Sequence, residues 1–202
     1  KVPFCKGLFS PSCDCALLNV QGHNWTALPD MVGGMTAMKT IVVNHGPLER
    51  VPGLTGLTKL TQVNLNHNRL VRVPDELGTL RLTKLELAYN RLIGLPPRMW
   101  GNPFLVYLDV STNNISKVEP HIENANILET LNLANNSLFC DAINFDKKES
   151  NLKRMETCSI LGLSKFVALR HINLDDNDFT KIGLPVVSNL IHIISHEKDD
   201  GI

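Results

Sequence analysis

Between residues 60 and 138 the sequence repeats one pattern of apolar residues and a single asparagine four times. The pattern is Leu-x-x-Leu-x-Leu-x-x-Asn-x-Leu, with Val or Ile at some apolar positions. The asparagine position is filled by Asn68, Asn90, Asn113 and Asn136. Each copy is too short to enclose a core alone, so its apolar residues must be covered by the copies on either side. The pattern therefore predicts a solenoid of stacked turns.

The repeat extends beyond this stretch in both directions. The same spacing assigns the asparagine position to His23 and Gly46 before Asn68, and to Asn177 after Asn136. Successive intervals are 23, 22, 22, 23 and 23 residues, followed by one of 41. We therefore expect about seven to eight turns.

Within each turn, alternation such as Val63-Asn64-Leu65 predicts a short strand with one buried face, and strands one turn apart should stack in parallel. A buried asparagine amide at the end of the strand can satisfy backbone groups that the turning chain leaves unpaired. The expected structural asparagines are Asn68, Asn90, Asn113, Asn136 and Asn177. His23 and Gly46 depart from this pattern and leave the asparagine ladder in doubt there.

After each of the first four predicted strands comes Leu-Pro or Val-Pro, at Pro29, Pro52, Pro74 and Pro96. Proline fixes its own φ and cannot donate to a ladder. We therefore expect it to start an irregular or short helical return on the convex side, as in residues 75–80.

These motifs resemble the leucine-rich-repeat family. The resemblance implies an α/β leucine-rich-repeat solenoid: a curved, right-handed solenoid with a parallel sheet on its concave side and irregular or short helical segments on its convex side. Members of the family act in recognition, often as receptor or adhesion domains. Residues 1–14 resemble the cysteine-containing N-terminal caps of extracellular members, so we expect a cap over 1–14 and a repeat domain over 15–202.

The five cysteines fall in two groups, which predicts a disulfide framework and an oxidising compartment. Cys15 stands in a slot that is leucine in most other repeats. We therefore expect Cys5 to pair with Cys13 and Cys15 to be buried as a small hydrophobe, with Cys5 to Cys15 as the alternative. The resembling caps commonly have four cysteines, whereas this one has three.

The 41-residue interval contains an insertion at about residues 140–158. Cys140 and Cys158 bound it, and a disulfide between them would close it. A short helix from about Lys147 to Thr157 is expected inside it. The insertion is either a contact loop or a cover for the solenoid.

Beyond Asn177 the pattern predicts an eighth strand from Leu190. The sequence starts without methionine and ends without a cysteine cap. We therefore expect the domain to belong to a longer protein.

Composition excludes several functions. Twenty basic and twenty acidic residues give no formal net charge, so neither nucleic acid nor a membrane surface is an expected partner. The longest apolar stretch, residues 184–194, is too short and too interrupted to span a membrane, and no signal segment is present. There is no glycine-rich phosphate loop, Gly-x-Ser-x-Gly or His-Glu-x-x-His motif. We expect no enzymatic activity and no cofactor.

N-glycosylation acceptors begin at Asn24, Asn114 and Asn135. Each asparagine lies one residue from the asparagine position of its turn, where the chain leaves the strand toward solvent. We expect a glycan on at least one of them.

Strand positions that alternate with the core positions form the exposed, concave face of the predicted sheet. These positions are amide-rich in the first half of the chain and gain acidic residues in the second. Amides and carboxylates can bind a peptide backbone or a glycan, and tyrosines can anchor it. The candidate ligand-binding residues are Asn64, Asn66, Glu86, Tyr89, Tyr107, Asp109, Ser111 and Asn132.

His45 and His67 precede the asparagine position in adjacent turns and should lie about 4.8 Å apart. Two stacked imidazoles could share a metal ion, or repel one another when protonated. The next residue in that column is Tyr89, so a third ligand is lacking and no metal site is expected.

Together these features predict a secreted or cell-surface glycoprotein ectodomain that binds a protein, peptide or glycan through its concave face. One alternative is a secreted inhibitor of an extracellular enzyme. Another is an intracellular scaffold or adaptor, because cytoplasmic members of the family share Leu-Pro repeats of 22–23 residues and lack cysteine caps.

Overall fold

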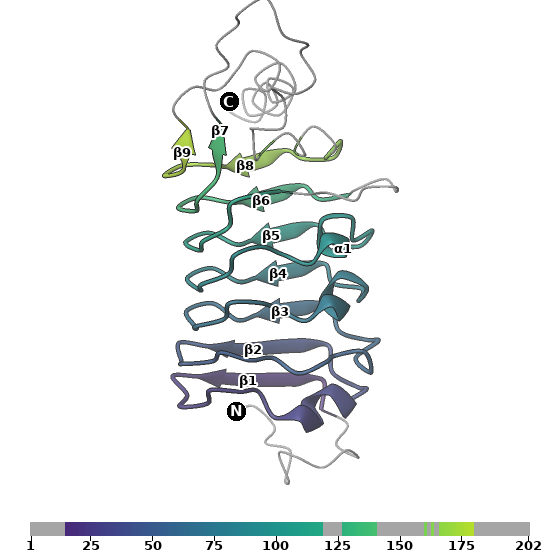
Figure 1. Cartoon of the computed structure of the whole chain (residues 1–202). Helices are drawn as coiled ribbons and strands as arrows, with labels where there is room; N and C mark the ends of the chain where they lie inside the picture. The colour runs from purple at the N-terminus through teal and green to yellow at the C-terminus, as the bar shows by residue number, and fades with distance from the viewer. Residues whose placement is uncertain (1–14, 119–126, 141–159, 161–162, 164–165, 180–202) are drawn as a thin grey trace, which may run out of the picture.

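The computed structural model describes residues 15–118, 127–140, 160, 163 and 166–179. These residues form a solenoid built on a seven-stranded parallel sheet with the order β1-β2-β3-β4-β5-β6-β8 (Figure 1). Its strands are β1 (Leu17–Gln21), β2 (Thr40–Asn44), β3 (Gln62–Asn64), β4 (Lys84–Glu86), β5 (Tyr107–Asp109), β6 (Thr130–Asn132) and β8 (His171–Asn173). The predicted solenoid with a parallel sheet is confirmed.

Neighbouring strands pair in the register that the repeat predicts. Asn64 of β3 lies opposite Glu86 of β4, which lies opposite Asp109 of β5, and Asn132 of β6 comes next. Residues at equal distances before the asparagine position therefore form continuous columns across the sheet.

The apolar positions of the pattern form one continuous core. In the third turn Leu60, Leu65 and Leu70 are 0%, 1% and 0% exposed, and their counterparts in the next turn are buried to the same degree. Because each turn supplies the same positions, every apolar layer is covered by the layers above and below it.

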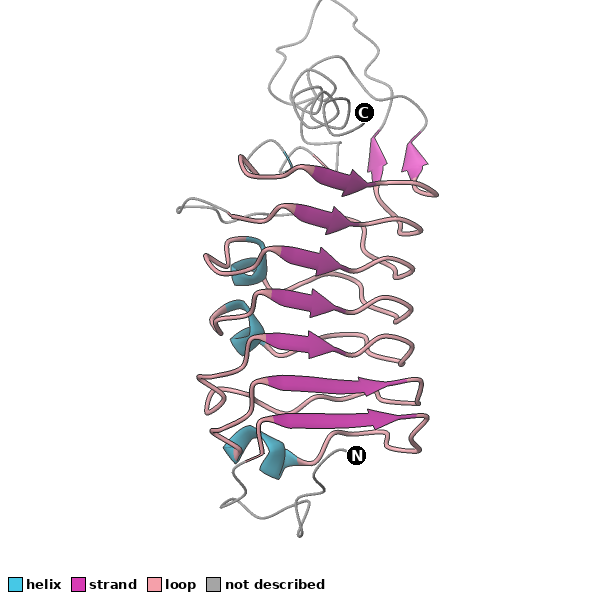
Figure 2. Ribbon diagram, turned by 180° about the vertical axis from the view of Figure 1, so that it is seen from behind, coloured by secondary structure: helices cyan, strands magenta, loops and turns pink. Residues whose placement is uncertain are grey.

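Three of the return segments contain a short helix, each starting after a proline. They are the 3₁₀ helices η1 (Asp30–Gly34) and η2 (Asp75–Gly78) and the single-turn helix α1 (Pro97–Trp100). Figure 2 shows all three at the same edge of the solenoid. The predicted irregular or short helical return after Leu-Pro and Val-Pro is confirmed: three returns contain a helix, and the return after Pro52 is irregular.

A second, narrower ladder runs along the side of the solenoid, just after the asparagine position of each turn. The Arg69 N–H donates to Leu48 O at 2.8 Å, and the Arg91 N–H donates to Leu70 O at 2.9 Å. At the C-terminal end it becomes a two-stranded parallel sheet of β7 (Phe139–Cys140) and β9 (Asp178–Phe179). We call the outward side of this ladder the flank.

The asparagines satisfy the backbone where the strands end. Asn68 Nδ2 donates to Val43 O at 2.8 Å and to Leu65 O at 3.0 Å, and its Oδ1 accepts from Leu48 N at 3.2 Å. The equivalent bonds recur at Asn90, Asn113, Asn136 and Asn177. Each amide thus joins two successive turns, as the repeat predicts.

The first turns replace this asparagine with a compensating pair. His23 is buried, and its Nδ1 accepts from the Trp25 N–H at 3.1 Å. In later turns the equivalent N–H donates to the asparagine one turn further on, but Gly46 has no side chain to offer. A side chain on Gly46 would clash with the His23 ring. His23 therefore fills the space that Gly46 leaves and takes over the missing hydrogen bond.

Cys15 corrects one expectation. It is half-buried against the first turn and is disulfide-bonded, so the expectation of a buried free thiol is wrong. Cys15 is the first described residue of the solenoid, and its side chain packs against the edge of the core and stays partly exposed. Which cysteine pairs with it remains a prediction, because the cap over residues 1–14 lies outside the described residues.

Three further expectations also lie outside the described residues. They are the insertion between Cys140 and Cys158, the helix over 147–157, and the strand from Leu190. In the part of the chain that the structure does describe, no helix has the length and apolar character needed to cross a membrane.

Candidate ligand-binding face

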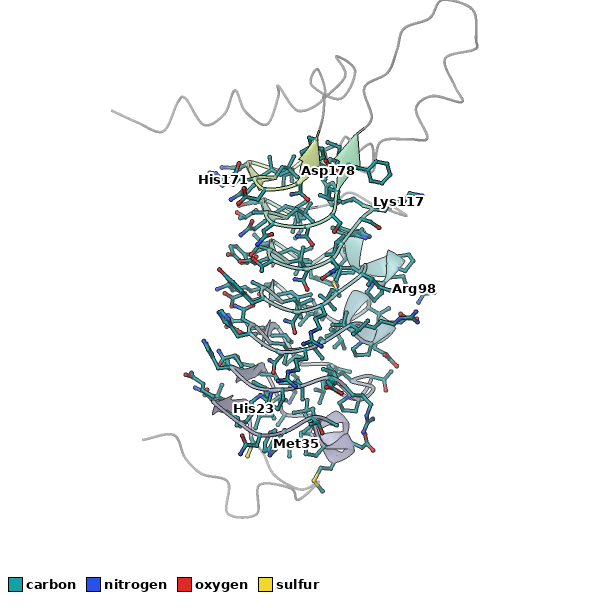
Figure 3. The ribbon with its side chains drawn as sticks, turned by 60° about the vertical axis from the view of Figure 1, so that its left-hand side comes forward. His23, Met35, Arg98, Lys117, His171 and Asp178 are labelled. Atoms are coloured by element: carbon teal, nitrogen blue, oxygen red, sulfur yellow. The ribbon has the colours of Figure 1, made fainter. Side chains whose placement is uncertain are left out.

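The outward side of the seven-stranded sheet, here called the sheet face, corresponds to the predicted concave surface. Asn64, Glu86, Asp109 and Asn132 lie side by side on it and are half-buried. Figure 3 shows His171 of β8 projecting from this side of the solenoid and Arg98 of α1 projecting from the opposite side. The register alone therefore brings four of the candidate residues into one row.

Three side chains on β3 and β4 form a hydrogen-bonded group in this row. Glu86 Oε2 lies 3.2 Å from Lys84 Nζ, and it accepts from Asn64 Nδ2 at 3.2 Å. The Lys84 ammonium and the Asn64 amide both contact this one oxygen and so restrict the position of the Glu86 carboxylate.

Tyr107 on β5 continues the group. Lys84 Nζ lies 4.9 Å from the centre of the Tyr107 ring, within the range of a cation–π contact. The pKa of Tyr107 is raised above its usual value of 10.0, mainly because the phenol is partly buried and also because the negative charges of Asp109 and Glu86 lie nearby. The phenol therefore stays protonated at neutral pH and can donate a hydrogen bond to a ligand.

Asp109 is positioned by its own strand. Its Oδ1 accepts from Ser111 Oγ at 2.7 Å and from the Ser111 N–H at 2.9 Å. Ser111 is buried, so its hydroxyl supports the carboxylate from behind. Asn132 Oδ1 bonds the N–H of Ala134 in a similar way, at 3.2 Å.

Asn66 also serves the scaffold. Its Oδ1 accepts from the Ala88 N–H of the next turn at 2.7 Å, and its own N–H donates to Asn64 Oδ1 at 3.1 Å. With its oxygen used in this way, the amide nitrogen of Asn66 is the part that could meet a ligand.

Tyr89 lies beyond the end of β4, in a separate aromatic group. The rings of His45 and His67 are stacked with centres 4.4 Å apart, and His67 and Tyr89 are stacked at 4.3 Å. All three residues have positive φ angles of 56°, 54° and 56°, which fix the side chains in one column at the rim of the sheet face. The predicted proximity of the two histidines is confirmed, and Tyr89 extends the stack.

This stack is unsuited to sharing a metal ion. Imidazole lone pairs lie in the ring plane, and the His45 and His67 planes are within 20° of parallel, so both rings cannot point at the same ion. No group of three or more His, Cys, Asp or Glu with metal-binding geometry occurs among the residues whose structure is described.

Lys84 is the residue of this face that the candidate set lacked. The sequence places it beside Tyr107, six residues before the asparagine position of its turn, and its register partner in the structure is Tyr107. This spacing is the feature of the sequence from which Lys84 could have been predicted to lie on the sheet face. Its contact with both Glu86 and Tyr107 depends on the side-chain conformation, which the pattern does not specify.

All three acceptor asparagines, Asn24, Asn114 and Asn135, are exposed. Asn135 belongs to the positive-φ column, with φ of 52°, and its Nδ2 donates to Thr112 Oγ1 at 3.4 Å. The exposure required for glycosylation is therefore present at each position.

No family model matches the chain, and neither does any curated protein. Solved structures do match it. A leucine-rich-repeat protein of Leptospira interrogans is 19% identical with a TM-score of 0.62, over 94% of this chain and 50% of that one. The leucine-rich-repeat ectodomain of the membrane receptor kinase GASSHO1/SCHENGEN3 from Arabidopsis thaliana, in complex with CASPARIAN STRIP INTEGRITY FACTOR 2, is 24% identical with a TM-score of 0.59. That match covers 81% of this chain and 18% of the receptor.

The plant peptide hormone receptor RGFR1, in complex with RGF2, is also 24% identical, with a TM-score of 0.57 over 81% of this chain and 24% of the receptor. The chain thus spans half or less of each of these proteins. At this level of identity the likeness shows the fold, which is the leucine-rich-repeat solenoid. The repeat in the sequence and the fold agree: the chain forms a leucine-rich-repeat solenoid.

Proposed function

We propose that this domain is a non-enzymatic recognition ectodomain that binds a peptide or protein segment through its sheet face. The observation that carries the proposal is the group formed by Lys84, Glu86, Tyr107 and Asp109. These residues come from two adjacent strands and are fixed by hydrogen bonds or ring contacts before any ligand arrives. Because the polar groups are already ordered, a ligand gains their hydrogen bonds at a small entropic cost.

The chemistry of the group suits a peptide. Carboxylates at Glu86 and Asp109 can accept from backbone N–H groups or basic side chains, and the Tyr107 phenol can donate to a backbone carbonyl. Both receptor ectodomains to which the chain is similar were solved in complexes, one of them described as a peptide hormone receptor.

Recognition accounts for this site better than catalysis. Glu86 and Asp109 are opposite each other on neighbouring strands, and both side chains are only half-buried. General acid and base roles need two carboxylates in environments that separate their pKa values, usually with water excluded.

An extracellular location is part of the proposal. Its support is the exposure of Asn24, Asn114 and Asn135 and the disulfide bond of Cys15. The peptide partner would accordingly be a secreted or cell-surface molecule.

The test begins with peptides selected from a random displayed library on the wild-type domain. Their affinity is then measured for the double variant Glu86→Gln/Tyr107→Ala. We expect a loss of roughly a hundredfold, because the variant removes one fixed carboxylate and the aromatic anchor beside it. The melting temperature should change by no more than about 3 °C, since both side chains are partly exposed.

The matched control is Asp30→Asn/Met31→Ala on η1, which also neutralises one carboxylate and truncates one exposed apolar side chain. It should bind the selected peptides as the wild type does. If the Glu86/Tyr107 variant retains wild-type affinity for them, the sheet face is not the binding surface.

A further inference from the structure

The flank carries a second set of ordered, exposed side chains that the sheet face does not use. Along it, Arg69 and Val71 are exposed while Leu70 between them is buried. The next turn repeats this arrangement with exposed Arg91 and Ile93. The hydrogen bond from Arg91 N to Leu70 O holds the two turns in register, so arginine lies beside arginine and aliphatic beside aliphatic.

The flank carries more basic than acidic side chains. Arg69, Arg72 and Arg91 are all exposed, and the ion pairs found within the described residues are Arg50 with Asp30 and Lys84 with Glu86. Glu49, three residues after Gly46, is an exposed carboxylate at the position that Val71 and Ile93 take in the next two turns, so three exposed arginines stand against one acidic residue there. The flank therefore favours an acidic partner.

The flank also exposes two aliphatic side chains. Val71 is 45% exposed and Ile93 is 52% exposed, which is unusual for two aliphatic residues in adjacent turns of a ladder. An open hollow of ≈ 320 Å³ adjoins Ile93 and is lined in part by Arg72, Asp75 and Pro96. A ligand that used only the arginines would leave this apolar area in water.

Two glycosylation acceptors lie at the ends of this surface. Asn24 and Asn114 each directly follow the asparagine position of their turn, which is the position of Arg69 and Arg91 in the turns between them. Both are exposed. Glycans there would leave the arginine-containing turns open and would limit a partner to that window.

We propose that the flank between Asn24 and Asn114 is a second binding surface, which takes an extended acidic segment of a partner protein. Glutamates of the segment pair with Arg69 and Arg91, whose planar guanidinium groups bind carboxylates through two hydrogen bonds. Aliphatic residues of the segment cover Val71 and Ile93. This proposal does not depend on the function proposed for the sheet face.

The probe is a fluorescently labelled synthetic peptide that repeats Glu-Ser-Leu-Ser, and fluorescence anisotropy measures its affinity for the whole chain. Arg69→Gln/Arg91→Gln should bind it roughly tenfold more weakly than wild type, and the wild-type affinity should fall as salt rises. Val71→Thr/Ile93→Thr, which keeps the β-branched shape, should also weaken binding by roughly tenfold. All substituted side chains are exposed, so the melting temperatures should match that of wild type.

The control is Lys59→Gln/Arg98→Gln, which removes two positive charges from exposed residues outside the flank and should leave the affinity unchanged. Glu86→Gln/Tyr107→Ala should also bind the probe normally, which separates this site from the sheet face. Failure of the wild-type protein to bind the peptide would overturn the proposal. So would full binding by the Val71/Ile93 variant together with tight binding of a sulfated oligosaccharide, since the flank would then be a general anion surface.

Discussion

At the scale of single residues, the polar side chains divide into those that hold the chain together and those available to a ligand. Asn68 and Asn66 are only two residues apart, yet the first is buried and bonds four backbone groups, while the second is half-buried, bonds one backbone N–H of the next turn through its side-chain oxygen and has its amide nitrogen available to a ligand. What separates them is the position in the repeat, since the same residue type occurs at both. Composition alone therefore gives no information on which asparagines recognise a ligand.

The first residue-scale prediction concerns the asparagine ladder. Asn90→Ala would leave the Leu70 N–H without its acceptor, and it would remove one of the two amide donors that bond each of Leu65 O and Leu87 O. We expect a loss of about 2–3 kcal/mol in the free energy of unfolding, measured by chemical denaturation, because one buried N–H is left unsatisfied and the other hydrogen bonds of the amide are lost. Asn114→Ala, an exposed asparagine directly after the next asparagine position, should change it by less than about 0.5 kcal/mol. Equal losses in the two variants would contradict a structural role for Asn90.

The second residue-scale prediction concerns the pH dependence of stability. Burial lowers the pKa of His23 from 6.5, so the unfolded chain takes up this proton more readily than the folded one. The stability that neutral His23 provides is therefore complete above the unfolded pKa and is lost as the pH falls below it toward the folded value.

We expect the free energy of unfolding of the wild type to decrease between about pH 7 and pH 5, as followed by denaturant titration. His23→Gln should be less stable at neutral pH but should show a weaker pH dependence over this interval. His171→Gln, at an exposed histidine, should keep the wild-type pH dependence. An unaltered dependence in the His23 variant would show that other groups cause it.

At the scale of elements, the strands are nearly identical, whereas the returns differ in length and conformation. Returns after Pro74 and Pro96 each form a short helix, and these two helices pack closely at Gly78. A Cβ atom at Gly78 would lie 2.7 Å from Met99 N and 2.8 Å from Arg98 C, which is closer than normal contact distances. The distance between adjacent turns on the convex side therefore depends on this glycine.

Gly78→Ala tests this packing. We expect it to lower the free energy of unfolding by about 1–3 kcal/mol, because backbone atoms of α1 must move to admit the methyl group. The control is Gly34→Ala at the end of η1, where an added Cβ meets no atom within 4 Å among the described residues. Thermal or chemical denaturation compares the two, and a neutral Gly78→Ala would mean that the returns are not closely packed in solution.

At the scale of the whole molecule, the solenoid separates surfaces of different chemical character. The sheet face presents carboxylates, the flank presents arginines and aliphatic residues, and the convex side presents the helical returns. Because each turn contacts only the turns beside it, each surface can vary in sequence without changing the core layers. A neutral net charge thus conceals two surfaces of opposite character.

The proposed location can be checked on the intact protein. Mass measured without reduction on material purified from its native source should show hexose-containing glycans and about four fewer hydrogens than the reduced chain, from two disulfides. Five free thiols and no glycan would instead support the intracellular scaffold. This measurement does not involve either binding surface.

The repeat by itself determined the strand register, the buried leucine positions and the asparagine ladder, because each follows from spacing alone. Spacing also placed Glu86 beside Asp109 and His45 beside His67. Only the tertiary structure decided the side-chain contacts between turns. The contacts of Lys84 with Glu86 and Tyr107 depend on side-chain conformation across two strands. The compensation of Gly46 by His23 depends on a ring filling a neighbour's volume. The arginines of the flank form a surface only when separate turns are stacked, because no single turn contains enough of them.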